Sequence, residues 1–298
     1  MKLFLDALDQ VLKQGTTRGD RTGTGTISLF GMQQRYNLAE SFPAVTTKKL
    51  AFKACVGELL WMIEGSGDER RLAEITYGDK EGAVTIWTPN ALAPYWKPKA
   101  KFEGDLGRVY GVQWRHWLQY DEQKDMGPAH LGGTRVAANR YEIDQLKSLI
   151  EGIKTDPHGR RHILTAWNPG ELQAMALPPC HCFAQFYVAD GKLSCQMYQR
   201  SCDMFLGVPF NIASYSLLTH MIAQVCGLKV GDFIHAIGDA HIYLNHIDQV
   251  KEQLTRAPLP APQLWLNPDI TDITKFTMDD IRLDGYTSHA PIKAVMAV

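Results

Sequence analysis

Apolar and polar positions recur along the chain with periods that predict several helices. Near the N-terminus the apolar residues fall at helical spacing, at Leu3, Leu5, Leu8, Val11 and Leu12. This spacing predicts an amphipathic helix over residues 1–14. Similar patterns predict helices at about 51–64 and 141–154. The segment 211–226 is apolar nearly all round and follows Pro209, which is typical of a buried helix.

Alternating positions predict strands at 26–36, 162–167, 184–189 and 192–200. The last two flank Asp190-Gly191, a dipeptide that favours a two-residue hairpin turn. Strands and helices alternate irregularly, with hairpins rather than repeated strand–helix–strand units. This organisation predicts an α+β fold, in which helices cover a large mixed β-sheet.

The chain shows no internal repeat and no linker rich in Gly, Pro or Ser. We therefore expect a single domain over residues 1–298, a length that can bury a full core. Two segments, near 88–104 and 120–139, have no clear period and are predicted to be loop insertions at the surface.

Composition excludes several classes of protein. Hydrophobic residues make up 45% and charged residues 21%, as in soluble globular proteins. A formal net charge of -1 provides no overall attraction to DNA or to an anionic membrane. No apolar run approaches the roughly twenty residues that span a bilayer, and the N-terminal pattern lacks a continuous apolar block. We expect a cytoplasmic protein in which most of the six cysteines are buried and reduced.

One cysteine has neighbours that suit catalysis. Cys180 follows Pro178-Pro179, and Arg200 and Ser201 lie about twenty residues further on. A thiolate nucleophile needs a lowered pKa, which a nearby cation provides. The same guanidinium can hold a phosphate group through paired hydrogen bonds. This combination favours an enzyme that acts on a phosphorylated substrate.

These residues belong to motifs that run nearly end to end, at 20–26, 58–61, 85–87, 107–115, 156–161, 178–181, 199–218, 238–243 and 292–298. In their order and spacing the chain resembles the folate-dependent thymidylate synthase family. The resemblance implies methylation of deoxyuridylate (dUMP) to thymidylate (dTMP). The family uses 5,10-methylenetetrahydrofolate for both the one-carbon unit and the hydride, so no metal and no nicotinamide are expected.

The resemblance also implies a nucleotide site and a dimer. Cys180 corresponds to the thiolate that adds to C6 of the uracil ring, and Arg160 and Arg161 to a pair that reaches into the partner's phosphate site. It implies a homodimer that packs sheet to sheet. His241 and Tyr243 would contact the sugar. The residues implied in dUMP binding are Arg21, Arg160, Arg161, Gln199, Arg200, Ser201, Asp203, Asn211, His241 and Tyr243.

Asn211 is the candidate reader of the pyrimidine. An amide offers a donor and an acceptor, so it can match O4 and N3–H of uracil together, whereas an aspartate would suit cytosine. Asn is also favoured at a helix N-cap, and both roles can hold at one position.

Glu58 lies in an apolar helical segment, where burial raises the pKa of a carboxyl and suits it to proton transfer. By resemblance Glu58 and Tyr110 remove the C5 proton, and the catalytic set is Cys180, Glu58, Tyr110, Asn211 and Arg200. The residues implied in folate binding are Lys48, Ile86, Trp87, Leu177, Asp203, Leu206, Gly207, Phe210 and Val298.

After Trp87 the chain departs from the family, because Thr88-Pro89-Asn90 replaces a short acidic and aromatic segment. The departure keeps open a dUMP hydroxymethylase, in which water captures the exocyclic methylene. Two weaker alternatives use the same cysteines. A zinc module lacks Cys-x-x-Cys spacing, and a Cys180–His181 protease pair would point to opposite faces of a strand.

Overall fold

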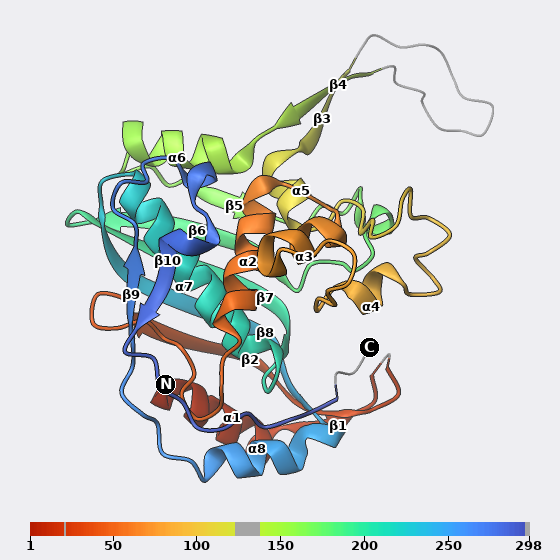
Figure 1. The fold of residues 1–298 in the computed structure, drawn as a ribbon, viewed down its shortest axis with the longest axis vertical. Helices are drawn as coiled ribbons and strands as arrows, with labels where there is room; N and C mark the ends of the chain where they lie inside the picture. The colour runs from red at the N-terminus through yellow and green to blue at the C-terminus, as the bar shows by residue number, and fades with distance from the viewer. Residues whose placement is uncertain (21, 123–137, 296–298) are drawn as a thin grey trace.

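The computed structural model describes residues 1–20, 22–122 and 138–295 (Figure 1). Within these ranges the largest sheet has six strands in the order β1-β2-β8-β7-β6-β5. The bounds are β1 (Thr16–Arg18), β2 (Thr26–Asn37), β5 (Ile163–Thr165), β6 (His181–Ala189), β7 (Lys192–Asp203) and β8 (Lys229–Tyr243). A large mixed sheet in an α+β fold was predicted from the sequence and is confirmed.

The strand pairings explain why the sheet is mixed. β7 and β8 are parallel, and the chain between them crosses back as helix α7 (Gly207–Val225). The other pairs in this sheet are antiparallel. The hairpin predicted at Asp190-Gly191 is confirmed: both residues have positive φ, 50° and 68°, as a tight primed turn requires.

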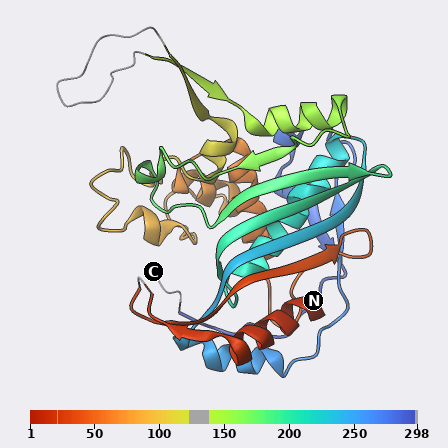
Figure 2. The ribbon, with the colours of Figure 1, turned by 180° about the vertical axis from the view of Figure 1, so that it is seen from behind.

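In the part of the chain that the structure describes, helices cover one face of the sheet and not the other. α7 packs on β7 and β8, and α2 (Phe52–Glu64) packs on α7. In Figure 1 both helices lie in front of the strands, and in Figure 2, from behind, the strands of the sheet face the viewer. Helix α7 is buried at nearly every position along its length, which confirms the prediction of a buried helix.

Helix boundaries differ from the predictions where proline and strand pairing decide them. α7 begins at Gly207 rather than about 211, because Pro209 lies in the first turn, where its missing N–H is tolerated. The helix predicted at 141–154 is α6 (Gln145–Thr155), since residues 141–143 pair in a strand. The remaining helices are α1 (Lys2–Gln14), α3 (Glu69–Tyr77), α4 (Thr88–Ala91), α5 (Tyr110–Arg115) and α8 (Ile247–Leu254).

The two predicted insertions are more ordered than loops at the surface. In the first, Trp96 is only 3% exposed and donates from Nε1 to the Asp105 carbonyl at 2.6 Å. In the second, β3 (Trp117–Glu122) pairs with β4 (Ala138–Ile143), while residues 123–137 of the predicted insertion lie outside the described residues. Figure 1 shows β3 and β4 leading away from the body of the protein.

The C-terminal part closes the layer over α7. β9 (Gln263–Leu266) pairs antiparallel with β10 (Ile281–Asp284), and short 3-10 turns at Ile273–Lys275 and Met278–Asp280 connect them. Across the described part of the chain, no helix combines the length and the apolar character needed to cross a membrane.

Candidate active site

Two adjoining compartments open beside Cys180, with volumes of about 240 and 430 Å³. The residues that line both are Asn90, Leu177, Cys180, Ser201, His241 and Tyr243. The smaller compartment is mainly apolar and includes Trp87 and Phe210. The larger one is polar and includes Arg18 and Arg200. The predicted nucleophile therefore lies where an apolar and a cationic space meet.

Cys180 is half-buried in front of β6 and is held through its backbone. Its N–H donates to the Tyr110 hydroxyl at 2.7 Å, and its carbonyl accepts from the Arg200 N–H at 2.8 Å. Burial raises the pKa of the Cys180 thiol, while the positive charge of Arg200 and the hydrogen bond from Tyr110 oppose this rise. The expectation of a lowered Cys180 pKa is wrong, because desolvation outweighs the effect of the cation.

Arg200 fixes the segment that carries the cysteine. Its Nε donates to the Pro179 carbonyl and its Nη2 to the Pro178 carbonyl, both at 2.8 Å. Its guanidinium lies 5.3 Å from the centre of the Trp167 ring. Because these bonds leave other N–H groups on the guanidinium, Arg200 can hold its own loop and still face the larger compartment.

Tyr110 occupies a strained backbone position. Its φ is 23°, a region that bulky residues rarely adopt, and it begins helix α5. Tyr110 is 2% exposed, and its ring packs at a tilt of 30° against that of His181, with centroids 4.2 Å apart. Burial raises the pKa of the Tyr110 hydroxyl well above its ordinary value, so the group stays protonated at neutral pH. The strain is concentrated at the residue that contacts the cysteine.

Glu58 extends from α2 into the apolar compartment. Its Oε1 accepts a hydrogen bond from Trp87 Nε1 at 2.6 Å. Desolvation raises the pKa of the Glu58 carboxyl, and the Trp87 bond partly offsets the rise. The predicted elevated pKa of this carboxyl is therefore supported by its surroundings.

A relay of hydrogen bonds orients Asn211. His235 lies 2.9 Å from Gln199 Oε1, and Gln199 Nε2 donates to Asn211 Oδ1 at 2.9 Å. Because the Gln199 oxygen can only accept, the buried His235 is the donor in this pair. The relay turns the Asn211 amine toward the compartment. Asn211 is the fifth residue of α7, so the alternative role as a helix N-cap is wrong.

The larger compartment contains a cation that sequence reasoning missed. Arg18, on β1, lies 3.6 Å from Asp239, and both residues line this compartment with Ser201. Asp20 organises the adjoining loop by accepting from the N–H of Gly25 at 2.6 Å. Gly25 has φ of 78°, and a Cβ there would lie 2.8 Å from Leu244. The available signal for Arg18 was its position next to the 20–26 motif.

Some predicted residues are not brought to the site. Lys48 is 7% exposed, and its Nζ donates to the Phe205 carbonyl at 2.5 Å, so its ammonium points inward. Burial lowers the pKa of Lys48 to about 8. Leu206 precedes α7 without lining either compartment, and Arg160 and Arg161 are exposed elsewhere. Arg21 and Val298 lie outside the described residues. All other predicted site residues line one or both compartments.

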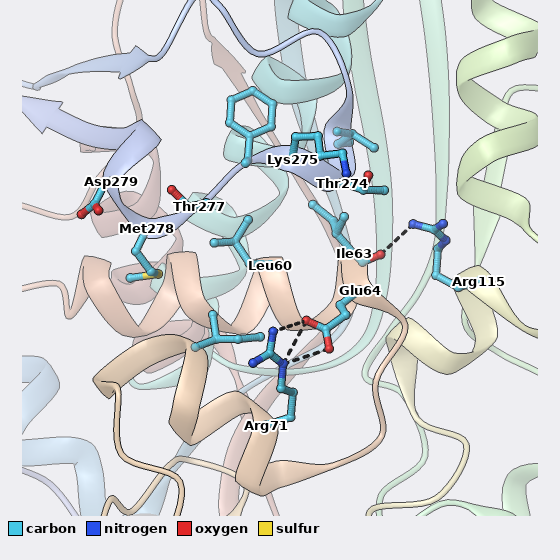
Figure 3. A pocket seen from close by; sticks show the side chains of 13 residues that line it. Leu60, Ile63, Glu64, Arg71, Arg115, Thr274, Lys275, Thr277, Met278 and Asp279 are labelled. Atoms are coloured by element: carbon cyan, nitrogen blue, oxygen red, sulfur yellow. Dashed lines mark hydrogen bonds and ion pairs between the residues drawn. The ribbon is translucent and has the colours of Figure 1, made fainter.

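A larger cleft, of about 810 Å³, lies between α2, α3 and residues 273–279 (Figure 3). Its arginines are already engaged: Arg71 pairs with Glu64 at 2.9 Å, and Arg115 pairs with Asp144 at 2.9 Å. The predicted catalytic residues do not line it. Among the described residues, no three His, Cys, Asp or Glu side chains are arranged to hold a metal ion.

A thiol between an apolar and a cationic compartment is an arrangement that suits covalent catalysis on a small anionic substrate. The sequence of residues 2–298 matches the family model described as thymidylate synthase. The chain therefore belongs to the thymidylate synthase family. Members use methylenetetrahydrofolate as co-substrate and act on a pyrimidine nucleotide, which fits an apolar and a cationic compartment side by side.

Proposed function

We propose that this chain methylates dUMP to dTMP, with 5,10-methylenetetrahydrofolate as the donor of both the one-carbon unit and the hydride. The observation that carries the proposal is the meeting of a thiol, a carboxyl, a phenol and an amide around one compartment. These groups belong to Cys180, Glu58, Tyr110 and Asn211. Each has the chemistry that one step of the reaction requires.

The nucleotide enters with its phosphate toward Arg18, Arg200 and Ser201 and its ring toward Asn211. The Cys180 sulfur forms a bond to C6, and the electrons of the C5–C6 double bond move onto O4 as an enolate. The Asn211 amine donates to that oxygen as it gains charge. Arg200 and Tyr110 favour the thiolate that starts the step.

C5 of the enolate then attacks the methylene carbon of the folate, and the C5 proton must leave. Glu58 and Tyr110 flank the cysteine on this side. A carboxyl whose pKa is raised by burial releases and takes up a proton more readily at higher pH than a free carboxyl, which suits Glu58 to the transfer. Loss of the proton expels tetrahydrofolate and leaves an exocyclic methylene on C5.

The apolar compartment is suited to hold the folate against that methylene. Its apolar lining consists of Ile86, Trp87, Leu177, Gly207 and Phe210. Asp203 lies on the same side and can accept N–H donors from the pterin. By excluding water, this wall favours hydride transfer, which gives dTMP and dihydrofolate and releases the thiolate.

One observation favours a second candidate, the hydroxymethylase. Asn90 lines both compartments, three residues after Trp87, and its amide can hold a water molecule near the reacting carbon. Water that captured the exocyclic methylene would give hydroxymethyl-dUMP and leave tetrahydrofolate. Against this, Trp87 is 6% exposed and its indole is fixed by Glu58.

Product analysis separates the two candidates. The enzyme is incubated with dUMP and 5,10-methylenetetrahydrofolate, and the products are identified by mass spectrometry. We expect dTMP with dihydrofolate. Hydroxymethyl-dUMP with tetrahydrofolate would contradict the proposal and favour the alternative.

We further propose that the active unit is a homodimer formed by the face of the sheet that the helices do not cover. Phe183, Tyr187 and Tyr198 point away from the core and are 38%, 64% and 41% exposed. Exposed aromatic side chains on a continuous sheet face are typical of an interface. Arg160 and Arg161 lie just ahead of edge strand β5, make no hydrogen bond or ion pair with described residues, and are proposed to complete the partner's phosphate site.

Mixed dimers test the shared site. Arg161→Ala and Cys180→Ser variants are each expected to be almost inactive. Subunit exchange between them should restore activity, because one site of each mixed dimer regains both residues. Lys154→Ala, which removes a nearby exposed cation on α6, serves as a control that should stay active. Failure to recover activity after exchange would argue against the shared site.

A further inference from the structure

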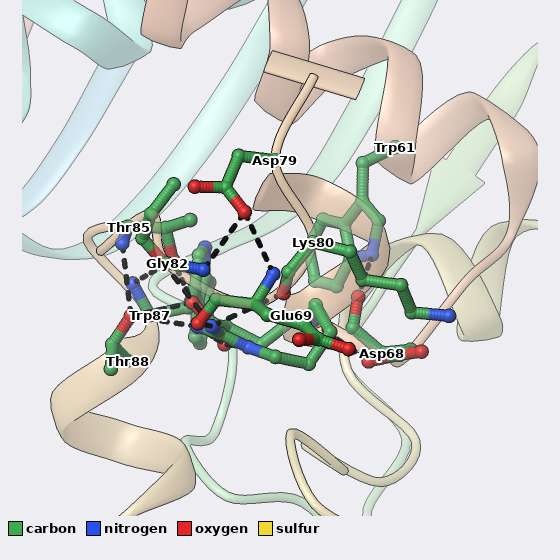
Figure 4. Close-up of polar contacts among 12 residues, drawn as sticks. Trp61, Asp68, Glu69, Asp79, Lys80, Gly82, Thr85, Trp87 and Thr88 are labelled. Carbon is green, nitrogen blue, oxygen red and sulfur yellow. Dashed lines mark hydrogen bonds and ion pairs between the residues drawn. The ribbon is translucent and has the colours of Figure 1, made fainter. Parts of the chain in front are cut away.

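A buried carboxylate outside the active site organises the segment that carries Trp87. Glu69, the first residue of α3, is 1% exposed (Figure 4). Its Oε1 accepts from the Thr85 hydroxyl at 2.6 Å and from the Thr88 hydroxyl at 2.5 Å. Its Oε2 accepts from Arg70 Nε at 2.6 Å. A buried charge needs such partners, and here every one belongs to α3 or to residues 85–88.

Arg70, which forms an ion pair with Glu69, also holds the start of the segment 79–88. Arg70 Nη1 donates to the Ala83 carbonyl at 3.3 Å and to those of Lys80 and Glu81 at 3.4 Å. Asp79 folds the turn by accepting from the N–H groups of Glu81 and Gly82 at 3.0 and 2.9 Å (Figure 4). Residues 79–88 are thus attached to the first turn of α3 at both ends.

The hydrogen bonds continue from Glu69 to the active site. A carboxylate can only accept, so the Thr85 hydroxyl must donate to Glu69, and its lone pairs face the backbone. There it accepts the Trp87 N–H at 3.1 Å. The Thr88 hydroxyl accepts the Thr85 N–H in the same way, at 2.9 Å. The Trp87 indole then donates to Glu58 at 2.6 Å.

Ring contacts and backbone hydrogen bonds also support Trp87. Its ring lies 6.0 Å from that of Trp61, tilted by 46°, and 5.7 Å from that of Tyr110, edge to face. Its carbonyl accepts from the N–H groups of residues 90 and 91 at 3.0 Å. The bonds at its own N–H and Nε1 are the ones that connect it to Thr85 and to Glu58. The tryptophan therefore lies between Glu69, which it meets through Thr85, and Glu58.

We propose that Glu69 is a positioning residue for the reaction, which sets Trp87 through Thr85 and thereby sets the Glu58 carboxyl. The inference rests on the proposed function, in which Glu58 moves a proton and Trp87 borders the folate. A buried ion pair that served stability alone would lower the unfolding free energy when altered, but it would not move Trp87 in the folded protein.

Fluorine NMR tests the positional link without any substrate. The protein is labelled with 5-fluorotryptophan, and the Trp87 resonance is assigned as the one that Trp87→Phe removes. In Glu69→Gln this resonance should shift or broaden. One carboxylate oxygen becomes an amide N–H₂ group, which cannot accept hydrogen bonds from the donors that contacted that oxygen. It should stay unchanged in Glu74→Gln, a control on the same helix whose carboxylate pairs with Arg71 at the surface. An unchanged Trp87 resonance in Glu69→Gln would overturn the proposal.

Thr85 provides a second variant in case Glu69→Gln does not fold. Thr85→Val removes the hydroxyl and keeps the shape and the Glu69–Arg70 pair, and it should produce a similar change in the Trp87 resonance. Thr85→Ser, which restores the hydroxyl, should bring the resonance back. A Thr85→Val spectrum that matches the wild type would also overturn the proposal.

Kinetics test the step from Trp87 to Glu58. In Glu69→Gln and Thr85→Val we expect kcat to fall about tenfold, a part of the roughly 10²–10⁴-fold that a positioned proton-transfer group contributes, with the KM for dUMP nearly unchanged. Loss of the Trp87 hydrogen bond should also raise the pKa of Glu58 further and move the acid limb of the rate profile to higher pH. A shifted Trp87 resonance with wild-type kcat and pH profile would overturn the role in catalysis. A wild-type enzyme inactive on dUMP would instead contradict the proposed function, and the NMR result would still decide whether Glu69 positions Trp87.

Discussion

If the site binds a pyrimidine as proposed, the direction of one amide side chain decides which pyrimidine it accepts. Asn211 directs its amide N–H₂ group toward the apolar compartment, because Gln199 Nε2 donates to Asn211 Oδ1 from behind, while His235 donates to Gln199 Oε1. An amine toward the ligand matches the O4 acceptor of uracil and opposes the exocyclic amine of cytosine. On the proposed function, selectivity therefore depends on the direction of a hydrogen-bond relay, and not on the shape of the pocket alone.

Asn211→Asp should reverse that preference. A carboxylate can accept from the cytosine amine but cannot donate to uracil O4, which would lose its partner and meet a negative charge. We expect kcat/KM for dUMP to fall about 100-fold, the range for an unmatched buried polar pair, and measurable turnover of deoxycytidylate to appear. Steady-state assays with both nucleotides check this. An unchanged ratio between the two substrates would show that another residue reads the base.

Elements with a clear hydrophobic period were predictable, and those that bury polar groups were not. Helix α3 was missed because its buried positions are Glu69, Leu72, Ala73 and Thr76, two of which are polar. Strand β8 is buried on both faces over much of its length and contains two glycines, so it shows little alternation. By contrast, the turn between β6 and β7 was predicted correctly. A two-residue hairpin turn needs positive φ at both positions, and Asp and Gly adopt this backbone more readily than most residues.

That turn offers a prediction confined to one element. Gly191 has φ of 68°, and a Cβ there would meet nothing within 4 Å, so the cost of Gly191→Ala is conformational. We expect the unfolding free energy to fall by about 1 kcal/mol and catalytic activity to remain. Gly191→Asn, which tolerates this backbone better, should cost less. Denaturant titration measures both, and equal stability of the two variants would contradict the role of the left-handed backbone.

At the scale of the whole molecule, most of the candidate site was predictable because its residues lie in motifs that the chain shares with a family. Cys180, Glu58, Tyr110 and Asn211 come together from separate elements, as expected. The sequence could not show that Arg18 lies beside Asp239, more than two hundred residues along the chain, nor could it indicate the link from Glu69 to Trp87, which forms only when residues 79–88 fold against α3. The expected fall in the Cys180 pKa failed for a similar reason: burial depends on the complete fold.

The core also contains imidazoles that set the response to pH. Burial lowers the pKa of His181 and of His235 to about 3, below the ordinary value of 6.5. Between pH 6.5 and pH 3 these imidazoles are protonated in the unfolded chain but neutral in the folded protein. The free energy of unfolding is therefore highest above about pH 6.5 and decreases as the pH falls. At pH 5 each imidazole should cost about 2 kcal/mol.

Urea unfolding at pH 7 and pH 5, at one protein concentration, measures this loss. We expect the unfolding free energy to decrease by several kcal/mol between the two, on the order of the sum for two imidazoles. A free energy that is flat or rises toward pH 5 would contradict neutral, buried imidazoles at these positions.

The bond between the Cys180 sulfur and the pyrimidine is tested most directly with the fluorinated nucleotide 5-fluorodeoxyuridylate. This nucleotide carries fluorine where dUMP carries the C5 hydrogen, and fluorine cannot be removed as a cation. The reaction with 5,10-methylenetetrahydrofolate should therefore stop at the covalent ternary complex. Peptide mass spectrometry should find the nucleotide and folate on the peptide that contains Cys180, and Cys180→Ser should yield no adduct while still binding dUMP. An adduct on another cysteine, or turnover that persists in Cys180→Ser, would contradict the account.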